Sequence, residues 1–155
     1  MASVLEYTAD SSPLLREWRE AGAAPADFLA EVRKHRRYQG ISWRGCSLRS
    51  VGRLSPVLST SREIQVAHNF CSYHCNPAII AFIGYEGYDI SSSSCHQAED
   101  EILLIIEQEI KTKLSTRLED IPVFLACKAK NSRQWEQEVI YQVNRFQDFL
   151  EEYDL

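Results

Sequence analysis

Apolar residues in the first forty positions recur three or four apart, which is the spacing of one helix face. Leu14, Leu15 and Trp18 follow a Ser-Ser-Pro sequence that is typical of a helix start. Beyond a break at 22–25, a second helical pattern runs over 26–38, and its basic end suits a helix C-terminus before a glycine. The pattern therefore predicts two helices within residues 1–40.

From residue 41 onward the chain changes to short apolar runs of strand length, separated by polar turns. Strands are predicted at 41–46, 57–61, 78–84, 88–90, 101–106, 123–129 and 139–146. Residues 62–70 predict one or two helical turns, and 91–94 predict a serine-rich turn. The range 110–118 fits either a strand or a helix, and 148–155 is an acidic end that is frayed or helical.

The order of these elements, helices first and strands afterwards, favours an α+β fold over alternating α/β units. At 155 residues the chain is the size of one domain, with a helical part at 1–40 and a mainly β core at 41–146. The composition, 45% hydrophobic and 25% charged, is that of a globular protein. The apolar stretches fall far short of the ~20 residues of a membrane span, and the first residues lack the pattern of a standard signal peptide.

Charge and cysteine content narrow the function classes. Seventeen Lys and Arg against 22 Asp and Glu give a net charge of −5. Such a chain gains little from phosphate contacts, which argues against general nucleic-acid binding. Five cysteines are an odd number and fit reduced thiols better than a complete disulfide framework.

Three short segments carry polar side chains inside otherwise apolar runs. They are Trp43-Arg44-Gly45, Ser59-Thr60-Ser61 and Glu99-Asp100-Glu101. Singly, each has an ordinary interpretation: an arginine at a strand edge, a hydroxyl-rich strand face, and two carboxylates that face solvent. In this order they resemble the R-S-E class of mono-ADP-ribosyltransferases, the cholera-toxin-like group. That class has an aromatic-Arg-Gly strand, a Ser-Thr-Ser strand and a Glu-x-Glu strand start.

The resemblance covers residues 38–106 and implies a fold with N-terminal helices on two small, roughly orthogonal β-sheets and an NAD cleft between them. It implies transfer of ADP-ribose from NAD to a protein side chain, with release of nicotinamide, and NAD glycohydrolysis when water replaces the acceptor. Glu101 would stabilise the charge that develops on the ribose, and Ser59 would orient Glu101. Arg44 would hold the pyrophosphate, and the main chain of Gly45 would hold the nicotinamide amide.

The resemblance assigns further binding residues around the nicotinamide. Thr60 and Ser61 are implied to hold the strand that forms the floor of its pocket. An aromatic ring is expected to stack on the cationic nicotinamide, and the candidates are Phe70, Tyr73 and Tyr38. Each of these rings also fits simple core packing.

Glu99 indicates the acceptor. In this class a glutamate two residues before the catalytic one accompanies transfer to arginine, because a carboxylate can bind and deprotonate a guanidinium. The implied partners are NAD, a protein that presents an arginine and a cognate immunity or inhibitor protein, with neither nucleic acid nor membrane. The class implies a bacterial toxin or effector, secreted or injected without a standard signal peptide and active in the target-cell cytoplasm; otherwise the chain is cytoplasmic.

Two other interpretations stay open at this point. His68, Cys71, His74 and Cys75 could hold a zinc ion in a small interaction domain, although their spacing is not a standard zinc pattern. The chain could also be a catalytically inactive binding module with this fold, but the presence of all three motifs argues against that. Residues 107–120 take the place of the proline-glycine turn usual in the class, and the range 107–122 has no assigned role.

Overall fold

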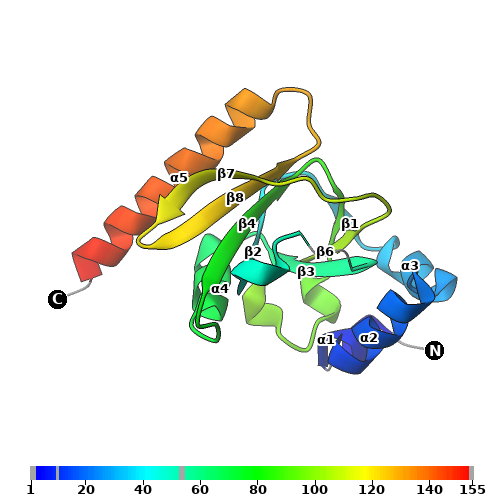
Figure 1. Ribbon diagram of the computed structural model, residues 1–155. Coiled ribbons are helices and arrows are strands. Elements are labelled where there is room, and N and C mark those ends of the chain that lie inside the picture. Colours follow the sequence, from blue (N-terminus) through cyan, green and yellow to red (C-terminus); the bar gives the residue numbers. More distant parts are fainter. Residues whose placement is uncertain (1–2, 10, 53–54, 154–155) are drawn as a thin grey trace.

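The computed structural model describes residues 3–9, 11–52 and 55–153 (Figure 1). The helices are α1 (Val4–Ala9), α2 (Ser11–Ala21), α3 (Ala26–Val32), α4 (Ile64–Cys71) and α5 (Ser132–Tyr153). The strands are β1 (Arg36–Tyr38), β2 (Ser42–Ser47), β3 (Val57–Ser61), β4 (Pro77–Ile83), β5 (Glu86–Asp89), β6 (Glu101–Ile105), β7 (Lys113–Leu118) and β8 (Ile121–Cys127). Short 3₁₀ turns are η1 (Leu48–Ser50), η2 (Ser91–Ser93) and η3 (Gln97–Glu99).

Eight strands join into one sheet in the order β1-β5-β6-β3-β2-β4-β8-β7. The sheet consists of two four-stranded halves, because β2 and β3 pair at a single position, Trp43 opposite Ser61. We call this junction the seam. The other neighbouring strands pair over three to six positions each. The predicted α+β class is confirmed, and the two small sheets expected from the sequence are the two halves of one hydrogen-bonded sheet.

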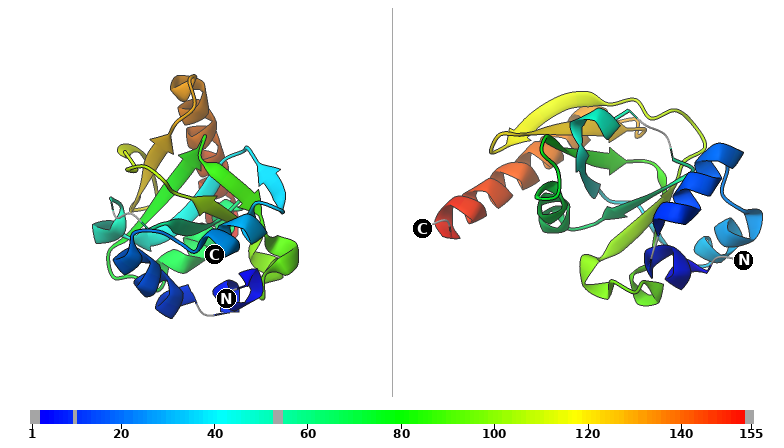
Figure 2. Two further views of the ribbon diagram at one scale, coloured as in Figure 1. Left: turned by 90° about the vertical axis from the view of Figure 1, so that its right-hand side faces the viewer. Right: turned by 60° about the horizontal axis from the view of Figure 1, so that its bottom comes forward.

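Three apolar clusters hold the layers together. The N-terminal helices pack on the β1-β5-β6-β3 half through residues such as Phe28. The two halves pack on each other through Ile80 of β4 and Leu104 of β6. The other half packs on α4 and α5 through residues such as Val139. The fold is therefore layered helix, half-sheet, half-sheet, helix, with α1–α3 and α5 on opposite sides (Figures 1 and 2).

The N-terminal part differs from the prediction in two ways. An additional helix, α1, precedes the two expected ones. The helix predicted over 26–38 ends at Val32, and residues 36–38 form β1 on the edge of β5, with Arg37 opposite Tyr88. The guanidinium of Arg37 also lies over the ring of Tyr88, 5.6 Å from its centroid. Pairing with an open strand edge thus overrides the helical pattern of these basic residues.

The strand predicted at 139–146 is wrong, because this range lies inside α5. Val139 and Val143 are fully buried four residues apart, and Phe146 and Leu150 continue the same face toward the core. The β-branched residues favour a strand locally, but their spacing is helical. Packing of this apolar face against β7 and β8 stabilises the helix.

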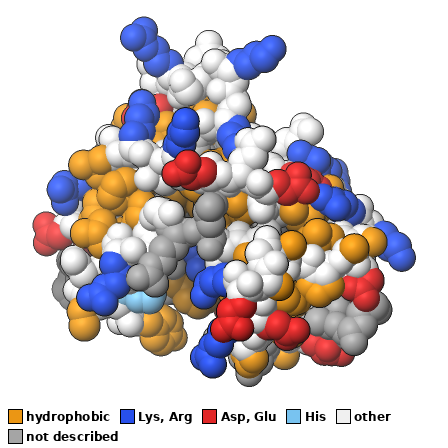
Figure 3. All heavy atoms as spheres, turned by 45° about the vertical axis from the view of Figure 1, so that its right-hand side comes forward, with side chains coloured by type: hydrophobic (Ala, Val, Ile, Leu, Met, Phe, Trp, Pro, Cys, Tyr) orange, Lys and Arg blue, Asp and Glu red, His pale blue; other side chains and the backbone are white. Residues whose placement is uncertain are grey.

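The other strand predictions are confirmed to within two residues at each end. The ambiguous range 110–118 contains β7, and the helical turns predicted at 62–70 overlap α4, which ends one residue later. All five cysteines are unpaired. Among the helices that the structure describes, none combines the length and apolar character of a membrane span. On the face drawn in Figure 3, basic and acidic side chains both occur around apolar ones.

Candidate active site

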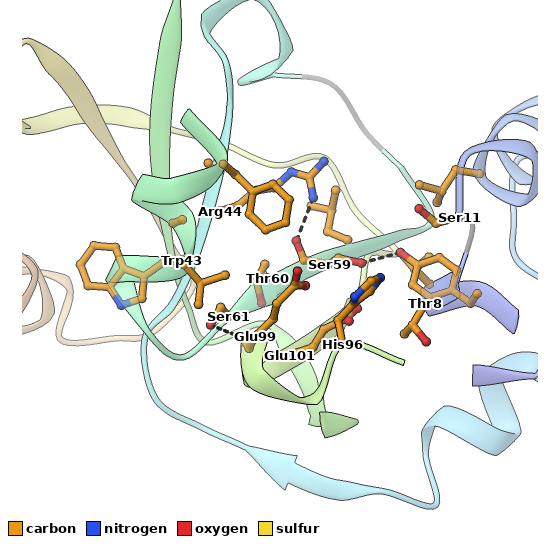
Figure 4. A pocket seen from close by; sticks show the side chains of 18 of the residues that line it. Thr8, Ser11, Trp43, Arg44, Ser59, Thr60, Ser61, His96, Glu99 and Glu101 are labelled. Carbon is orange, nitrogen blue, oxygen red and sulfur yellow. Dashed lines mark hydrogen bonds between the residues drawn. The ribbon is translucent and has the colours of Figure 1, made fainter. Parts of the chain in front are cut away.

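A cleft of about 490 Å³ opens between α1, the strands at the seam and α4. All three sequence motifs reach this cleft, and Figure 4 draws Arg44, Ser59, Glu99 and Glu101 around it. The lining residues are Tyr7, Thr8, Ser11, Leu15, Trp43, Arg44, Gly45, Val57, Leu58, Ser59, Thr60, Ser61, Val66, Ala67, Phe70, His74, His96, Glu99 and Glu101.

Glu101 is the buried carboxylate of the cleft. It begins β6 opposite Ser61 of β3, and only 6% of its surface is exposed. Burial raises the pKa of its carboxyl above the ordinary value, the hydroxyl of Ser59 lowers it and the charge of Glu99 raises it. The Ser94 hydroxyl donates a hydrogen bond to Oε1 of Glu101 at 3.3 Å. Hydroxyl donors thus orient the Glu101 carboxylate in a poorly solvated site. Such a carboxylate is suited to stabilise a nearby positive charge.

Ser59 of β3 connects the other polar groups. Its hydroxyl oxygen lies 2.8 Å from the Tyr7 hydroxyl, and the same hydroxyl lowers the pKa of Glu101. Its carbonyl oxygen accepts a hydrogen bond from Nη1 of Arg44 at 2.8 Å. Because Arg44 lies on β2, this bond crosses the seam and fixes the guanidinium to β3, the strand between β2 and β6.

The next two hydroxyls of the motif hold the backbone in place. Thr60 Oγ1 donates to the carbonyl oxygen of Ile102 at 2.6 Å, and Ser61 Oγ donates to the carbonyl oxygen of Glu99 at 2.6 Å. Both hydroxyls therefore fasten β3 to β6 and to the turn that precedes it. These bonds agree with a supporting role for the two residues, and their contact with nicotinamide stays a prediction.

The carboxylate of Glu99 lines the cleft beside that of Glu101. Asp100, between them, has a left-handed backbone with φ of 47°, which turns the chain from η3 into β6. Glu99 is half-buried, and its carboxylate accepts no hydrogen bond from the part of the chain that the structure describes. It is thus a charged group available to a ligand.

Gly45 permits close packing behind the cleft. Helix α4 lies so near β2 that a Cβ at Gly45 would overlap the carbonyl oxygen of Ala67. This close approach brings Phe70 into the cleft wall, where its ring is 40% exposed. Tyr73 is 80% exposed and does not line the cleft. Phe70 is the better placed of these two candidates for stacking.

Tyr38, the third stacking candidate, does not line the cleft. Its hydroxyl donates to the carbonyl oxygen of Ile41 at 2.7 Å, and its ring lines a separate hollow beside Trp135 of α5. The physical reason is the pairing of β1 with β5, which holds Tyr38 at the far edge of the sheet order.

The residues considered for zinc do not converge. The His68 ring lies 3.1 Å from Glu119, and Cys71, the last residue of α4, is buried in the core. His74 and Cys75 are exposed. Within the described ranges, no three His, Cys, Asp or Glu side chains lie close enough together to hold a metal ion.

Helix α1 and the loop 91–99 supply groups that the sequence motifs did not include. Tyr7 and Thr8 line the cleft from α1, and His96 lines it from the loop. The Thr8 hydroxyl oxygen accepts the backbone N–H of Cys95 at 3.0 Å, which ties the loop to α1. Apolar residues at positions 4 and 7 were the one local signal for this short helix.

Comparison with solved structures shows the fold of the bacterial ADP-ribosyltransferases. Exoenzyme S of Pseudomonas aeruginosa, in complex with human 14-3-3 protein beta and bound to carba-NAD, aligns with a TM-score of 0.56 at 19% identity, over 80% of this chain and 70% of that one. The Vis toxin, an ADP-ribosyltransferase from Vibrio splendidus, aligns with a TM-score of 0.52 at 20% identity, over 83% and 72%.

An ADP-ribosyltransferase from Clostridium botulinum also aligns, with a TM-score of 0.51 at 18% identity, over 79% of this chain and 83% of that one. At these identities the likeness establishes the fold that the sequence motifs predicted. The sequence itself matches no protein-family model and no curated protein.

Proposed function

We propose that this chain is an NAD-dependent mono-ADP-ribosyltransferase whose acceptor is an arginine side chain. The observation that carries the proposal is the convergence of Arg44, Ser59, Glu99 and Glu101 on one cleft, in a fold shared with ADP-ribosyltransferases. These residues come from three strands and a turn, so a shared role explains their meeting better than separate structural roles do. In this proposal residues 1–155 act as one catalytic domain.

Arg44 and the α4 wall would bind NAD. The Ser59 carbonyl occupies one Nη of the guanidinium, and the remaining N–H donors are available to the pyrophosphate. The half-exposed ring of Phe70 offers a π-face to the cationic nicotinamide. The backbone of Gly45, which no side chain of its own covers, offers its N–H and C=O to the nicotinamide amide.

Glu101 would promote cleavage of the bond between nicotinamide and ribose. The bond's electron pair leaves with the nicotinamide ring, which becomes neutral, so no acid is needed. Positive charge then develops on the ribose, and the buried Glu101 carboxylate stabilises it across a short, poorly solvated distance. Ser59 and Ser94 hold that carboxylate in place and counteract the effect of burial on its pKa.

Glu99 would act on the acceptor. A guanidinium is a poor nucleophile until it loses a proton, and the Glu99 carboxylate stands beside Glu101 with no internal partner among the described residues. It can bind the guanidinium and accept its proton while a guanidine nitrogen bonds to the ribose carbon. With water as the nucleophile, the same site would hydrolyse NAD.

The biological setting follows from the proposed activity. A bacterial toxin or effector that modifies a host or rival protein would act in the target-cell cytoplasm after secretion or injection. A producing cell would then need an immunity or inhibitor protein, for which the cleft mouth is the natural target.

Incubation with isotope-labelled NAD and a cell lysate, followed by mass spectrometry of the labelled residue, tests the proposal. We expect ADP-ribose on arginine with the parent chain and none with Glu101→Gln. Glu152→Gln, on the exposed end of α5, is the matched control and should behave like the parent chain. Folded protein that neither labels a protein nor releases nicotinamide would favour the inactive binding module.

A further inference from the structure

Tyr7 is the buried group of the cleft that none of the roles above uses. Its side chain is 1% exposed, and its ring packs against Trp18 and Phe28 of α2 and α3. Its hydroxyl reaches out of this aromatic cluster to the Ser59 hydroxyl, 2.8 Å away and 52 residues later in the chain. A hydroxyl in an apolar cluster needs a partner. The partner here is Ser59, which lies two residues before Ser61, the strand partner of Glu101, and lines the same cleft as Glu101.

The direction of the hydrogen bonds follows from the donors present. An ionised carboxylate only accepts, so the single proton of Ser59 must point to Glu101 for the two to interact. On distance alone either hydroxyl could donate; with the Ser59 proton directed to Glu101, the Ser59 oxygen is the acceptor and Tyr7 is the donor. Burial raises the pKa of Tyr7 to about 12, so the phenol keeps its proton over the physiological range.

We propose that Tyr7 is a positioning residue for catalysis: it donates to Ser59 and thereby directs the Ser59 hydroxyl proton toward Glu101 and strengthens that interaction. This inference rests on the proposed function of the cleft. It gives the N-terminal helices a role in the chemistry, because α2 and α3 fix the Tyr7 ring and α1 supplies the hydroxyl. Chains of hydrogen bonds reinforce one another in poorly solvated sites.

Other charged groups also act on Glu101. Glu99 raises the pKa of Glu101, and His96 lowers it from the loop side. Arg44 lines the same cleft from β2. Removal of the Tyr7 hydroxyl leaves all of these in place, so a change in the pKa of Glu101 reports on the Tyr7–Ser59 contact.

Tyr7→Phe, Ser59→Ala and the double variant test the proposal. Tyr7→Phe should lower kcat for nicotinamide release about three- to tenfold with KM for NAD unchanged, the effect of one net hydrogen bond. The same change in the Ser59→Ala background should have no further effect. Tyr88→Phe is the matched control: it removes a buried tyrosine hydroxyl that donates to Glu86 on β5, outside the cleft, and should not change kcat.

Titration of the Glu101 carboxyl by nuclear magnetic resonance tests the role of Tyr7 without relying on enzymatic activity. Tyr7→Phe should raise the pKa of Glu101, while a fluorotyrosine at position 7, a stronger donor, should lower it. Equal losses of kcat in the parent and Ser59→Ala backgrounds, or an unmoved Glu101 pKa, would overturn the role of Tyr7. Absence of any NAD turnover would instead overturn the proposed function, and the titration would still decide on Tyr7.

Discussion

Glu99→Gln is expected to separate transfer to arginine from hydrolysis of NAD. The change removes one negative charge and keeps the size of the side chain. Glu99 lies at a half-buried position beside Glu101, and its backbone is held by Ser61 independently of its carboxylate. The variant should therefore keep its fold and lose only what the charge does.

The magnitude divides into a binding part and a chemical part. A charge pair at a partly exposed position contributes ~0.2–1 kcal/mol, so KM for the acceptor should rise by at most about fivefold. Loss of a general base costs about 10²- to 10⁴-fold in rate, so kcat for transfer should fall by that factor. Hydrolysis has no guanidinium to bind or deprotonate, so its rate should stay within about fivefold of the parent rate.

The pH dependence adds a second signature with a definite sign. Glu99 raises the pKa of Glu101, so its removal lowers that pKa. The ionised form of Glu101 then persists to lower pH, and the acid limb of the hydrolysis profile should move down. Transfer should show no gain at any pH.

The assay measures nicotinamide release and ADP-ribosylated arginine peptide in the same reaction mixture, with Glu152→Gln as the control. Equal loss of both activities would place Glu99 in NAD binding and refute the reasoning. Undiminished transfer would refute its role as a base, and labelling of asparagine, threonine or cysteine would refute the arginine assignment.

Three further predictions concern binding and stability. Arg44→Lys should weaken NAD binding about tenfold or more by calorimetry, because an ammonium lacks the planar fork that can bond the Ser59 carbonyl and make a bidentate contact with the pyrophosphate, and hydrogen bonds to charged groups are worth ~1.5–3 kcal/mol. Unchanged affinity would make Arg44 purely structural. Gly45→Ala should cost ~1–3 kcal/mol in denaturant unfolding, because its Cβ would overlap the backbone of α4, whereas Gly52→Ala, which meets open space, should cost far less. Glu101→Gln should raise the melting temperature at pH 7. The pKa of Glu101 is higher in the folded than in the unfolded state, so the carboxyl destabilises the fold as the pH rises from the unfolded-state pKa through the folded-state pKa. The difference in melting temperature between variant and parent should vanish at a pH below the unfolded-state pKa.

The sequence predicted the part of the site that lies in short contiguous motifs. Arg44 and Ser59 lie inside strands and Glu101 begins one, so apolar neighbours fix their positions, and all three line the cleft. Local sequence patterns gave the wrong secondary structure where pairing with a distant strand determines it. Residues 36–38 pair with β5, which removes Tyr38 from the cleft, and the pairing could not be read from a helical pattern.

The C-terminal helix and the role of Tyr7 show two different limits. In 139–146, Val139 and Val143 have helical spacing, but the β-branched composition of the range favours a strand. Hydrophobic periodicity is the stronger of these two signals, and it indicates the helix. The contact between Tyr7 and Ser59 has no local signal at all, because 52 residues separate the two and only the packing of α1 on the sheet brings them together.

The seam determines how ligand binding would change the local stability of the two half-sheets. Each half-sheet has its own strand ladder, and one backbone pair, Trp43 with Ser61, joins them beside the hydrogen bond from Arg44 to Ser59. Two such units can open separately, and amide hydrogen exchange would reveal them as blocks of different protection. A molecule held by Arg44 on one side and Glu101 on the other adds a further connection between the blocks. Occupancy of the cleft should therefore slow exchange at the seam far more than at the outer edges of the sheet, and would merge two cooperative units into one.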